Sequence, residues 1–162
     1  MKTVAWTLVA LLLTTTLEAG NWPQLLGPER DGTYRGEPVQ VAWGETVPRV
    51  LWSVELGEGF AGPVAVEDVV YIAHRRGGEL LLDALQIDSG GRLWRASHPT
   101  GYRDDFGFNG GPRATPVVAG DRVFTVSAEG ILQAVDRDNG NRLWLVDTQE
   151  AFDIPRSCLL YT

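Results

Sequence analysis

One segment of this chain occurs twice, and this repetition limits the fold more than any other property of the sequence. The first copy runs from Gly62 to Trp94 and the second from Thr115 to Trp144. Both copies end in Arg-Leu-Trp, after a turn that reads Asp-Ser-Gly in the first copy and Asp-Asn-Gly in the second. A partial third copy, Val-Leu-Trp, ends at Trp52. Such self-similarity predicts supersecondary units that stack on one another.

The repeat spacing and pattern predict blades of four strands. The repeated tryptophans are 42 and 50 residues apart, near the period of about 40–50 residues of propeller blades. Each copy holds four short runs of Val, Ile, Leu and aromatic residues, separated by turns that contain Gly or Asn. No stretch after residue 20 has a helical period. We therefore expect an all-β chain, part of a β-propeller of four-stranded antiparallel blades, with strands at 64–66, 69–73, 80–87, 92–96, 116–119, 122–127, 131–136 and 142–147.

The pattern also divides the chain into segments. An N-terminal extension covers residues 20–49 and a partial propeller covers residues 50–150. The orphan strand would complete the last blade of a closed propeller, so we expect an N-terminal piece of a longer protein. Such a piece leaves apolar faces uncovered, so it is expected to aggregate or associate when expressed alone. The parts of the propeller are an orphan outer strand at 50–56 and blades at 60–96 and 114–147.

Seven repeated residues are assigned structural rather than catalytic roles. A tryptophan at the same place in each copy suits the gap between adjacent blades, where its area counts most. The aspartate and glycine before it make the reversal into the outer strand, and the aspartate is expected to accept backbone N–H bonds there. The set is Trp52, Asp88, Gly90, Trp94, Asp138, Gly140 and Trp144.

The second copy resembles a known repeat. Residues 134–144 read Ala-Val-Asp-Arg-Asp-Asn-Gly-Asn-Arg-Leu-Trp, which is similar to the Ala-x-Asp-x-x-(Thr/Ser/Asn)-Gly-x-x-x-Trp signature of the pyrroloquinoline-quinone-like (PQQ-like, or quinoprotein-like) propeller repeat. The first copy has Gln86 where this pattern has Asp. Residues 21–32 resemble the Trp-Pro-Gln-x-x-Gly-Pro-x-Arg-Asp-Gly start of secreted bacterial members. The resemblance covers about residues 21–150 and implies several more blades.

The resemblance leaves more than one function open. Quinone-dependent dehydrogenases of this superfamily hold PQQ and calcium in the central funnel, with adjacent cysteines, a stacking tryptophan, acidic calcium ligands and a catalytic aspartate. This chain has one cysteine and no haem motif, so no catalytic residue, cofactor contact or metal ligand is assigned, and His74 and His98 have no metal-pair spacing. A binding or scaffolding module is favoured. The alternatives are the N-terminal part of a PQQ-type alcohol dehydrogenase, and an assembly factor like the propeller that aids outer-membrane protein insertion.

The link between the two copies departs from the repeat. It mixes aromatic and acidic residues, glycines and a histidine, a composition common in ligand-binding loops. Its acidic and amide side chains offer oxygens that suit calcium, although their spacing matches no defined calcium loop. Its last arginine precedes a strand expected to line the channel, where it would meet an anion. The alternative is a solvated connection whose Phe106 and Phe108 pack on the neighbouring blade. The candidate ligand residues are Asp104, Asp105, Asn109 and Arg113.

The two ends and the net charge bear on location and partners. Residues 1–19 have the layout of a signal peptide, with an uncleaved anchor as the alternative, so a periplasmic or extracellular protein is expected without a membrane span after cleavage. The net charge of −7 argues against nucleic acid and leaves a protein, glycan or small molecule as partner, besides the missing blades. Residues 151–162 form a non-repeat tail. Its end, 158–162, resembles a translated sequencing adapter, with a genuine apolar end as the alternative.

Overall fold

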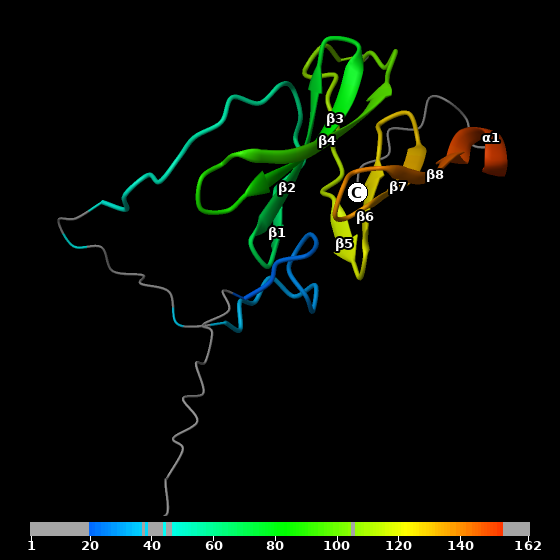
Figure 1. Cartoon of the computed structure of the whole chain (residues 1–162). Helices are drawn as coiled ribbons and strands as arrows, with labels where there is room; N and C mark the ends of the chain where they lie inside the picture. The colour runs from blue at the N-terminus through cyan, green and yellow to red at the C-terminus, as the bar shows by residue number, and fades with distance from the viewer. Residues whose placement is uncertain (1–19, 37, 39–43, 45–46, 105, 154–162) are drawn as a thin grey trace, which may run out of the picture.

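The computed structural model describes residues 20–36, 38, 44, 47–104 and 106–153. Within them lie two four-stranded sheets, each a meander in which consecutive strands pair antiparallel (Figure 1). The expected signal peptide, Asp105 and residues 154–162 of the tail lie outside the described residues. The first blade contains β1 (Val64–Val66), β2 (Val69–Arg76), β3 (Glu79–Gln86) and β4 (Arg92–Pro99), and the second contains β5 (Val117–Ala119), β6 (Arg122–Val126), β7 (Ile131–Asp136) and β8 (Arg142–Asp147).

The all-β architecture of four-stranded blades is confirmed. The strands expected at 64–66, 131–136 and 142–147 have the same bounds in the structure. By contrast, β2 and β4 each continue three residues past their expected ends, because Arg76 pairs with Glu79 across the first hairpin and Glu79 pairs with Pro99. Those extra residues are mostly polar, so the apolar pattern does not reveal them.

The structure has one helix that the sequence pattern does not predict. α1 (Thr148–Phe152) is a single short turn after β8. The Asp147 carboxylate caps it by accepting from the backbone N–H groups of Gln149 and Glu150. Five residues are too few to show a helical period. Among the described residues, no helix is long and apolar enough to cross a membrane.

The core lies between the two sheets. Cross-strand neighbours share a face, so Tyr71, Ala84 and Trp94 of the first blade point the same way, toward the second blade. Val123 and Val135 of the second blade belong to the same buried cluster, and both are fully buried. The buried cluster consists of Val64, Val66, Tyr71, Ala73, Leu82, Ala84, Val118, Val123 and Val135.

Each repeated tryptophan that is followed by a blade docks on the β3–β4-type turn of that blade. Trp52 lies against Gly90, and its indole N–H donates to the carbonyl three residues before that glycine at 2.6 Å. Trp94 lies against Gly140 in the same way, with a donor–acceptor distance of 2.9 Å. A Cβ on either glycine would come within 2.7 Å of the ring. The tryptophan contact therefore needs glycine at this turn. The carbonyls that accept from the two indole N–H groups belong to Ile87 and Arg137.

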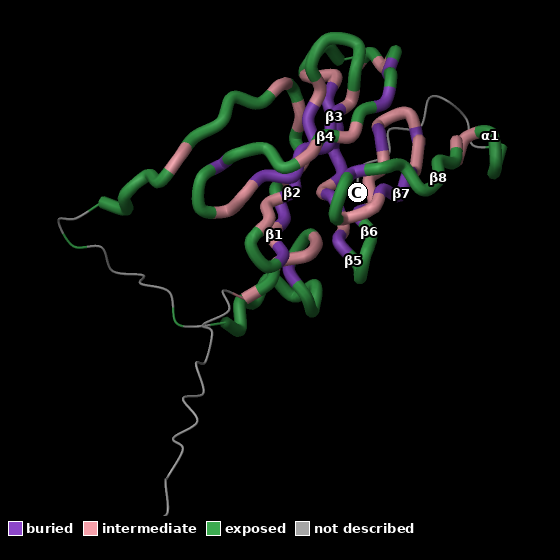
Figure 2. Tube along the Cα trace, viewed as in Figure 1, coloured by how far each residue is buried: buried purple, intermediate pink, exposed green. Residues whose placement is uncertain are grey.

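Trp144 has the internal packing of Trp94 but no turn over it among the described residues. Trp94 tilts against Tyr71 at 5.8 Å between ring centroids, and Trp144 tilts against Phe124 at 5.9 Å. Trp144 is nevertheless 37% exposed, and most of β8 is exposed with it (Figure 2). At the other end, residues 50–56 carry Trp52 but belong to no strand ladder of the described residues. These two features fit the uncovered blade faces expected of a partial propeller.

The turn acceptors differ from those expected. In the second blade it is Asp136, not Asp138, whose carboxylate accepts from backbone N–H groups, at 2.9 Å and 3.2 Å. Asp138 and Asp88 both point to solvent as exposed residues. The carboxylate at the third position of the repeat therefore closes the turn, because it can reach the two N–H groups that follow. In the first blade that position is Gln86, and the turn is closed by backbone bonds, such as Gly90 N–H to the Gln86 carbonyl at 2.8 Å, and by Ser89 Oγ, which accepts from the N–H of Gly91 at 3.2 Å.

Residues 20–36 hydrogen-bond to an edge strand of each blade, β1 in the first and β5 in the second. Trp22 and Ala65 exchange backbone hydrogen bonds of 2.7 Å and 3.0 Å, and the carbonyl of Pro23 accepts from the N–H of Val118 at 2.8 Å (Figure 1). Ala65 belongs to β1 and Val118 to β5, which are edge strands of separate sheets. This part of the N-terminal extension thus covers backbone groups that an edge strand leaves unpaired and joins the two blades.

We predict that Gly140→Ala destabilises the chain more than Gly120→Ala. Both glycines have positive φ, which costs an alanine about 1 kcal/mol. Only at position 140 would the added Cβ meet Trp94, at 2.5 Å, whereas position 120 is open. Urea denaturation should show an extra loss of roughly 1–3 kcal/mol for Gly140→Ala. Equal losses for the two variants would contradict the docking contact.

We predict that Gln86→Asp stabilises the first blade. The aspartate restores the carboxylate that closes the turn of the second blade, where Asp136 accepts two N–H bonds. The expected gain is about 0.5–1.5 kcal/mol in the free energy of unfolding. Asp136→Gln is the matched reverse change and should cost a similar amount. A Gln86→Asp variant that unfolds more easily than the parent would show that the two turns are not equivalent.

Candidate functional site

The candidate ligand loop lies at one end of the first blade. Because Glu79 pairs with Pro99, the loop of residues 100–113 leaves β4 beside the turn between β2 and β3. Glu58 bridges to Arg75 at the same end. The loop, this turn and the segment around Glu58 therefore form one surface, which we call the loop face.

Arg75 fastens the loop to the first blade. Its Nη1 donates to the carbonyls of Tyr102 at 2.6 Å and Gly110 at 3.0 Å, and its Nε donates to the carbonyl of Gly77 at 2.8 Å. The carboxylate of Glu58 accepts from the N–H of Gly110 at 3.2 Å. One arginine thus holds both ends of the loop against the β2–β3 turn.

Asp104 organises the interior of the loop. One carboxylate oxygen accepts from the N–H groups of Phe108 at 2.7 Å and Asn109 at 3.3 Å, and the other lies 3.2 Å from Arg113 Nη2. Its side chain is only 3% exposed. Burial works to raise the pKa of Asp104, but the backbone N–H groups and the Arg113 charge outweigh it and lower the pKa. Asp104 is therefore a carboxylate that closes a turn of the loop.

Arg113 is also turned inward. Its side chain is 6% exposed and its guanidinium lies between the rings of Phe60 and Tyr102, at 5.4 Å and 5.6 Å from their centroids. Its Nη1 donates to the carbonyl of Asn109 at 3.2 Å. Within the described structure its charge is met by Asp104 and by two aromatic faces, and not by an open channel.

The oxygens proposed for a cation are therefore committed elsewhere. Asn109 Oδ1 accepts from the N–H of Gly111 at 2.8 Å, and both oxygens of Asp104 face donors. Asp105 lies outside the described residues. In the described ranges, no three His, Cys, Asp or Glu side chains gather as a metal site would require. The described residues do not fit the calcium and quinone that the family resemblance implies, so no chemical step is derived through them.

Two phenylalanines take the opposite direction. Phe106 is 66% exposed and Phe108 is 78% exposed, with ring centroids 6.3 Å apart and nearly parallel planes. The expectation that they pack on the neighbouring blade is wrong, because both rings are mostly exposed to solvent. Phe108 borders an open cavity of about 340 Å³, lined with Glu58, Arg75, Gly77, Tyr102, Arg103, Asp104, Gly107, Phe108, Asn109 and Gly110.

A buried polar network lies on the face of the first sheet opposite to Tyr71, Ala84 and Trp94. Asp83 is 4% exposed and accepts from Arg95 at 2.6 Å and 2.7 Å and from His74 Nε2 at 3.0 Å. His74 Nδ1 in turn accepts from the N–H of Gly57 at 3.1 Å. Burial tends to raise the pKa of Asp83, but its bonds to Arg95 and His74 lower it overall. Because both Asp83 oxygens and both His74 nitrogens are occupied, this network ties the segment before β1 to the blade and offers no ligand.

A family model matches most of the chain. Residues 39–157 match the PQQ-like family described as "Outer membrane protein assembly factor BamB". The chain belongs to this family. A comparison with curated proteins returns no match.

A solved structure shares the fold of this chain. The quinohemoprotein alcohol dehydrogenase from Comamonas testosteroni is 18% identical, with a TM-score of 0.55 over 80% of this chain and 20% of the dehydrogenase. BamB from Moraxella catarrhalis is 22% identical, with a TM-score of 0.37 over 57% of this chain and 24% of that protein. The chain thus spans a quarter or less of the length of these propeller proteins.

We predict that Asp104→Ala loosens the loop without any link to calcium. Loss of the carboxylate frees the N–H groups of Phe108 and Asn109, so their amide hydrogen exchange should speed up roughly tenfold. Asp121→Ala removes an exposed carboxylate elsewhere and should leave these amides unchanged. Millimolar calcium should not shift the thermal unfolding of the parent chain. A calcium-dependent rise in Tm that Asp104→Ala abolishes would contradict this assignment.

Proposed function

We propose that this chain is part of a periplasmic or extracellular PQQ-like propeller that binds a protein partner through the loop face. The observation that carries the proposal is the exposed Phe106–Phe108 pair. Exposed aromatic rings on an ordered support are typical of the centres of protein interfaces. Arg75, Asp104, Asn109 and Arg113 are used to hold the loop, and its outward chemistry is the two rings together with the exposed Arg103.

The loop is suited to binding because it is organised before a partner arrives. Arg75, Asp104 and Arg113 fix it through charge-assisted bonds to backbone atoms and to one another. A loop held in this way loses little conformational entropy on binding, so more of the contact energy is available for affinity. Burying one phenylalanine side chain contributes about 1.5–3 kcal/mol, so the pair is large enough to dominate a modest interface.

The favoured partner is an extended segment with aromatic side chains, as in a strand of an outer-membrane protein. The family description, an assembly factor for outer membrane proteins, supports this chemistry. Such strands alternate apolar and polar residues and carry aromatic girdles. The open cavity beside Phe108, with Arg103 and Glu58 at its rim, would receive the polar side chains between the aromatic ones.

The enzymatic alternative, the N-terminal part of a PQQ-type dehydrogenase, rests on fold similarity alone. A shared fold does not decide function, and the described residues supply no fitting donor set for the quinone and calcium. Reconstitution of the full chain with PQQ and calcium, followed by a dye-reduction assay with alcohols, separates the readings. Alcohol-dependent dye reduction would favour the enzyme.

We predict that replacing both loop-face rings weakens peptide binding at least tenfold, about 1.4 kcal/mol. The probe is a fluorescent ten-residue peptide of alternating aromatic and polar residues, followed by anisotropy. The variant is Phe106→Ser/Phe108→Ser. Phe152→Ser is the matched control, because Phe152 is 71% exposed but lies on α1, and it should bind like the parent chain.

Two outcomes would contradict the protein-binding proposal. The first is a parent chain that does not bind the peptide, or a double variant that binds as tightly as the parent. The second is tight binding of soluble peptidoglycan fragments, lost in the double variant, with no peptide binding. Circular dichroism of both variants should match the parent chain, since neither ring contributes to the buried core.

A further inference from the structure

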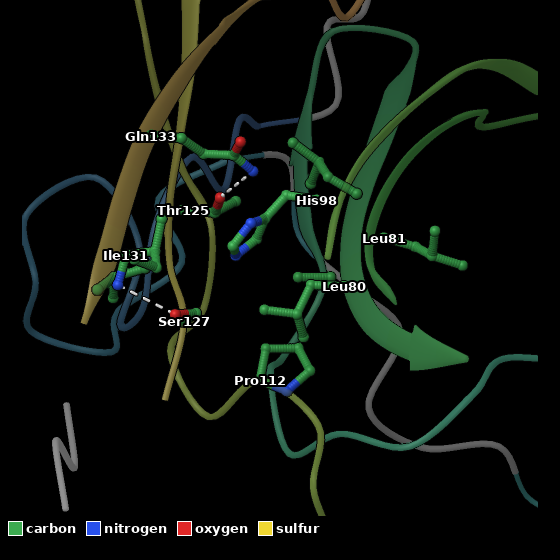
Figure 3. Close-up of a pocket in the computed structure, with 11 residues that line it drawn as sticks. Leu80, Leu81, His98, Pro112, Thr125, Ser127, Ile131 and Gln133 are labelled. Atoms are coloured by element: carbon green, nitrogen blue, oxygen red, sulfur yellow. Dashed lines mark hydrogen bonds between the residues drawn. The ribbon is translucent and has the colours of Figure 1, made fainter. Parts of the chain in front are cut away.

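The seam between the blades contains a buried histidine that no sequence pattern singles out. His98, near the end of β4, is 8% exposed and faces Leu80's side of β3. Figure 3 shows its ring directed at the second blade, toward Thr125, Ser127 and Gln133. His98 is a polar ring between two sheets whose buried cluster consists of aliphatic and aromatic side chains.

The surroundings of His98 offer little to an imidazolium ion. Its Nε2 is buried and makes no hydrogen bond within the described residues. Two of the polar neighbours already share a bond, from Gln133 Nε2 to Thr125 Oγ1 at 3.0 Å, and Ser127 Oγ accepts from the backbone N–H of Ile131 at 3.0 Å. The cavity beside the ring has a volume of about 20 Å³, enough for about one water molecule. A second proton on the ring would therefore be poorly solvated.

The charged groups around His98 do not compensate. From the β6–β7 turn, Glu129 attracts the protonated ring, but its carboxylate already accepts from Thr100 Oγ1 at 2.6 Å and from the N–H of Gly101 at 3.2 Å. From β8, Arg142 repels the protonated ring. Asp147, which together with Tyr102 and His98 lines an open pocket of about 340 Å³, is the cap of α1. Burial, the largest effect, and Arg142 lower the pKa of His98 despite Glu129.

We propose that His98 is a proton-sensitive contact between the two blades, and that its protonation loosens the seam where the loop of residues 100–113 begins. Thr100 and Gly101 follow His98 by two and three residues and anchor the loop to Glu129 of the second blade. Movement of the His98 backbone away from the second blade would displace these anchors. This inference concerns the seam itself and stands independently of the partner that the loop face binds.

The sign of the effect follows from proton linkage. The folded chain disfavours protonated His98, whereas the unfolded chain protonates it near pH 6.5. Stability from neutral His98 is therefore complete above about pH 6.5 and falls as the pH drops from there toward the lowered pKa of the folded state. One linked proton changes the folding equilibrium constant by at most about tenfold per pH unit.

The test compares the full chain with His98→Gln, which keeps a polar side chain but does not titrate. Urea denaturation is measured between pH 5 and 7.5. As the pH falls, the folding equilibrium constant of the parent should decrease by up to about tenfold per pH unit more than that of the variant. Hydrogen-exchange protection, corrected for the slower intrinsic exchange at lower pH, should fall in residues 98–104 and 125–131 of the parent at pH 5.5 relative to pH 7.5, and not in the variant. Parallel pH profiles for the two proteins would overturn the proposal.

A second measurement guards against a variant that fails to fold. An ordinary histidine titrates near pH 6.5. NMR of the parent chain should show the His98 ring titrating below that pH. A His98 titration at or above that value would overturn the proposal, whatever the behaviour of the variant. Peptide affinity is not used as a readout, so failure here is distinct from failure of the proposed function.

Discussion

The structure depends on one contact that is made twice, a tryptophan ring laid on the glycine of the next blade's turn. An antiparallel blade has two apolar faces and needs a neighbour on each. The Trp52–Gly90 and Trp94–Gly140 contacts set the distance between neighbours, and the indole N–H fixes the orientation through a backbone carbonyl. The buried cluster between the sheets then fills the space that these contacts define. Trp144 is the same group with no turn over it among the described residues.

The loop face is a consequence of this seam. Because the tryptophan contact holds the two blades at one end, the chain that passes between them at the other end can be long and shaped by its own polar groups. The charged side chains of the loop face bind within it. Arg75 and Asp104 bond to backbone groups of the loop, and Asp104 pairs with Arg113. That inward use of polar side chains leaves Phe106 and Phe108 facing outward. Charge thus builds the loop, and the exposed aromatic surface is the feature on which the proposed binding rests.

The repeat predicts most of the fold because each copy contains the same local features, which are apolar strands, turns with Gly or Asn, and one tryptophan. It does not predict features that depend on distance in space. The turn acceptor is Asp136 rather than Asp138, since only the geometry of the turn tells which carboxylate reaches the N–H groups. The ends of β2 and β4 are polar, and α1 is too short for a period.

The candidate site was less predictable than the fold. Acidic and amide residues in a loop suggest a ligand site, but whether their oxygens face outward depends on neighbours far along the chain. Asp104 meets Arg113, and Asn109 bonds to Gly111. His98 gives no pattern at all, because its role comes from a sheet that begins nearly twenty residues later.

Hydrogen exchange of the tryptophan indole N–H groups tests the central claim most directly. The account places the N–H groups of Trp52 and Trp94 in hydrogen bonds to the turns they cover, and leaves Trp144 on an exposed face. In a two-dimensional NMR experiment on the 162-residue chain, the first two should exchange at least about a hundredfold more slowly than the third. Equal exchange for all three indoles would show that the tryptophans do not hold the blades together.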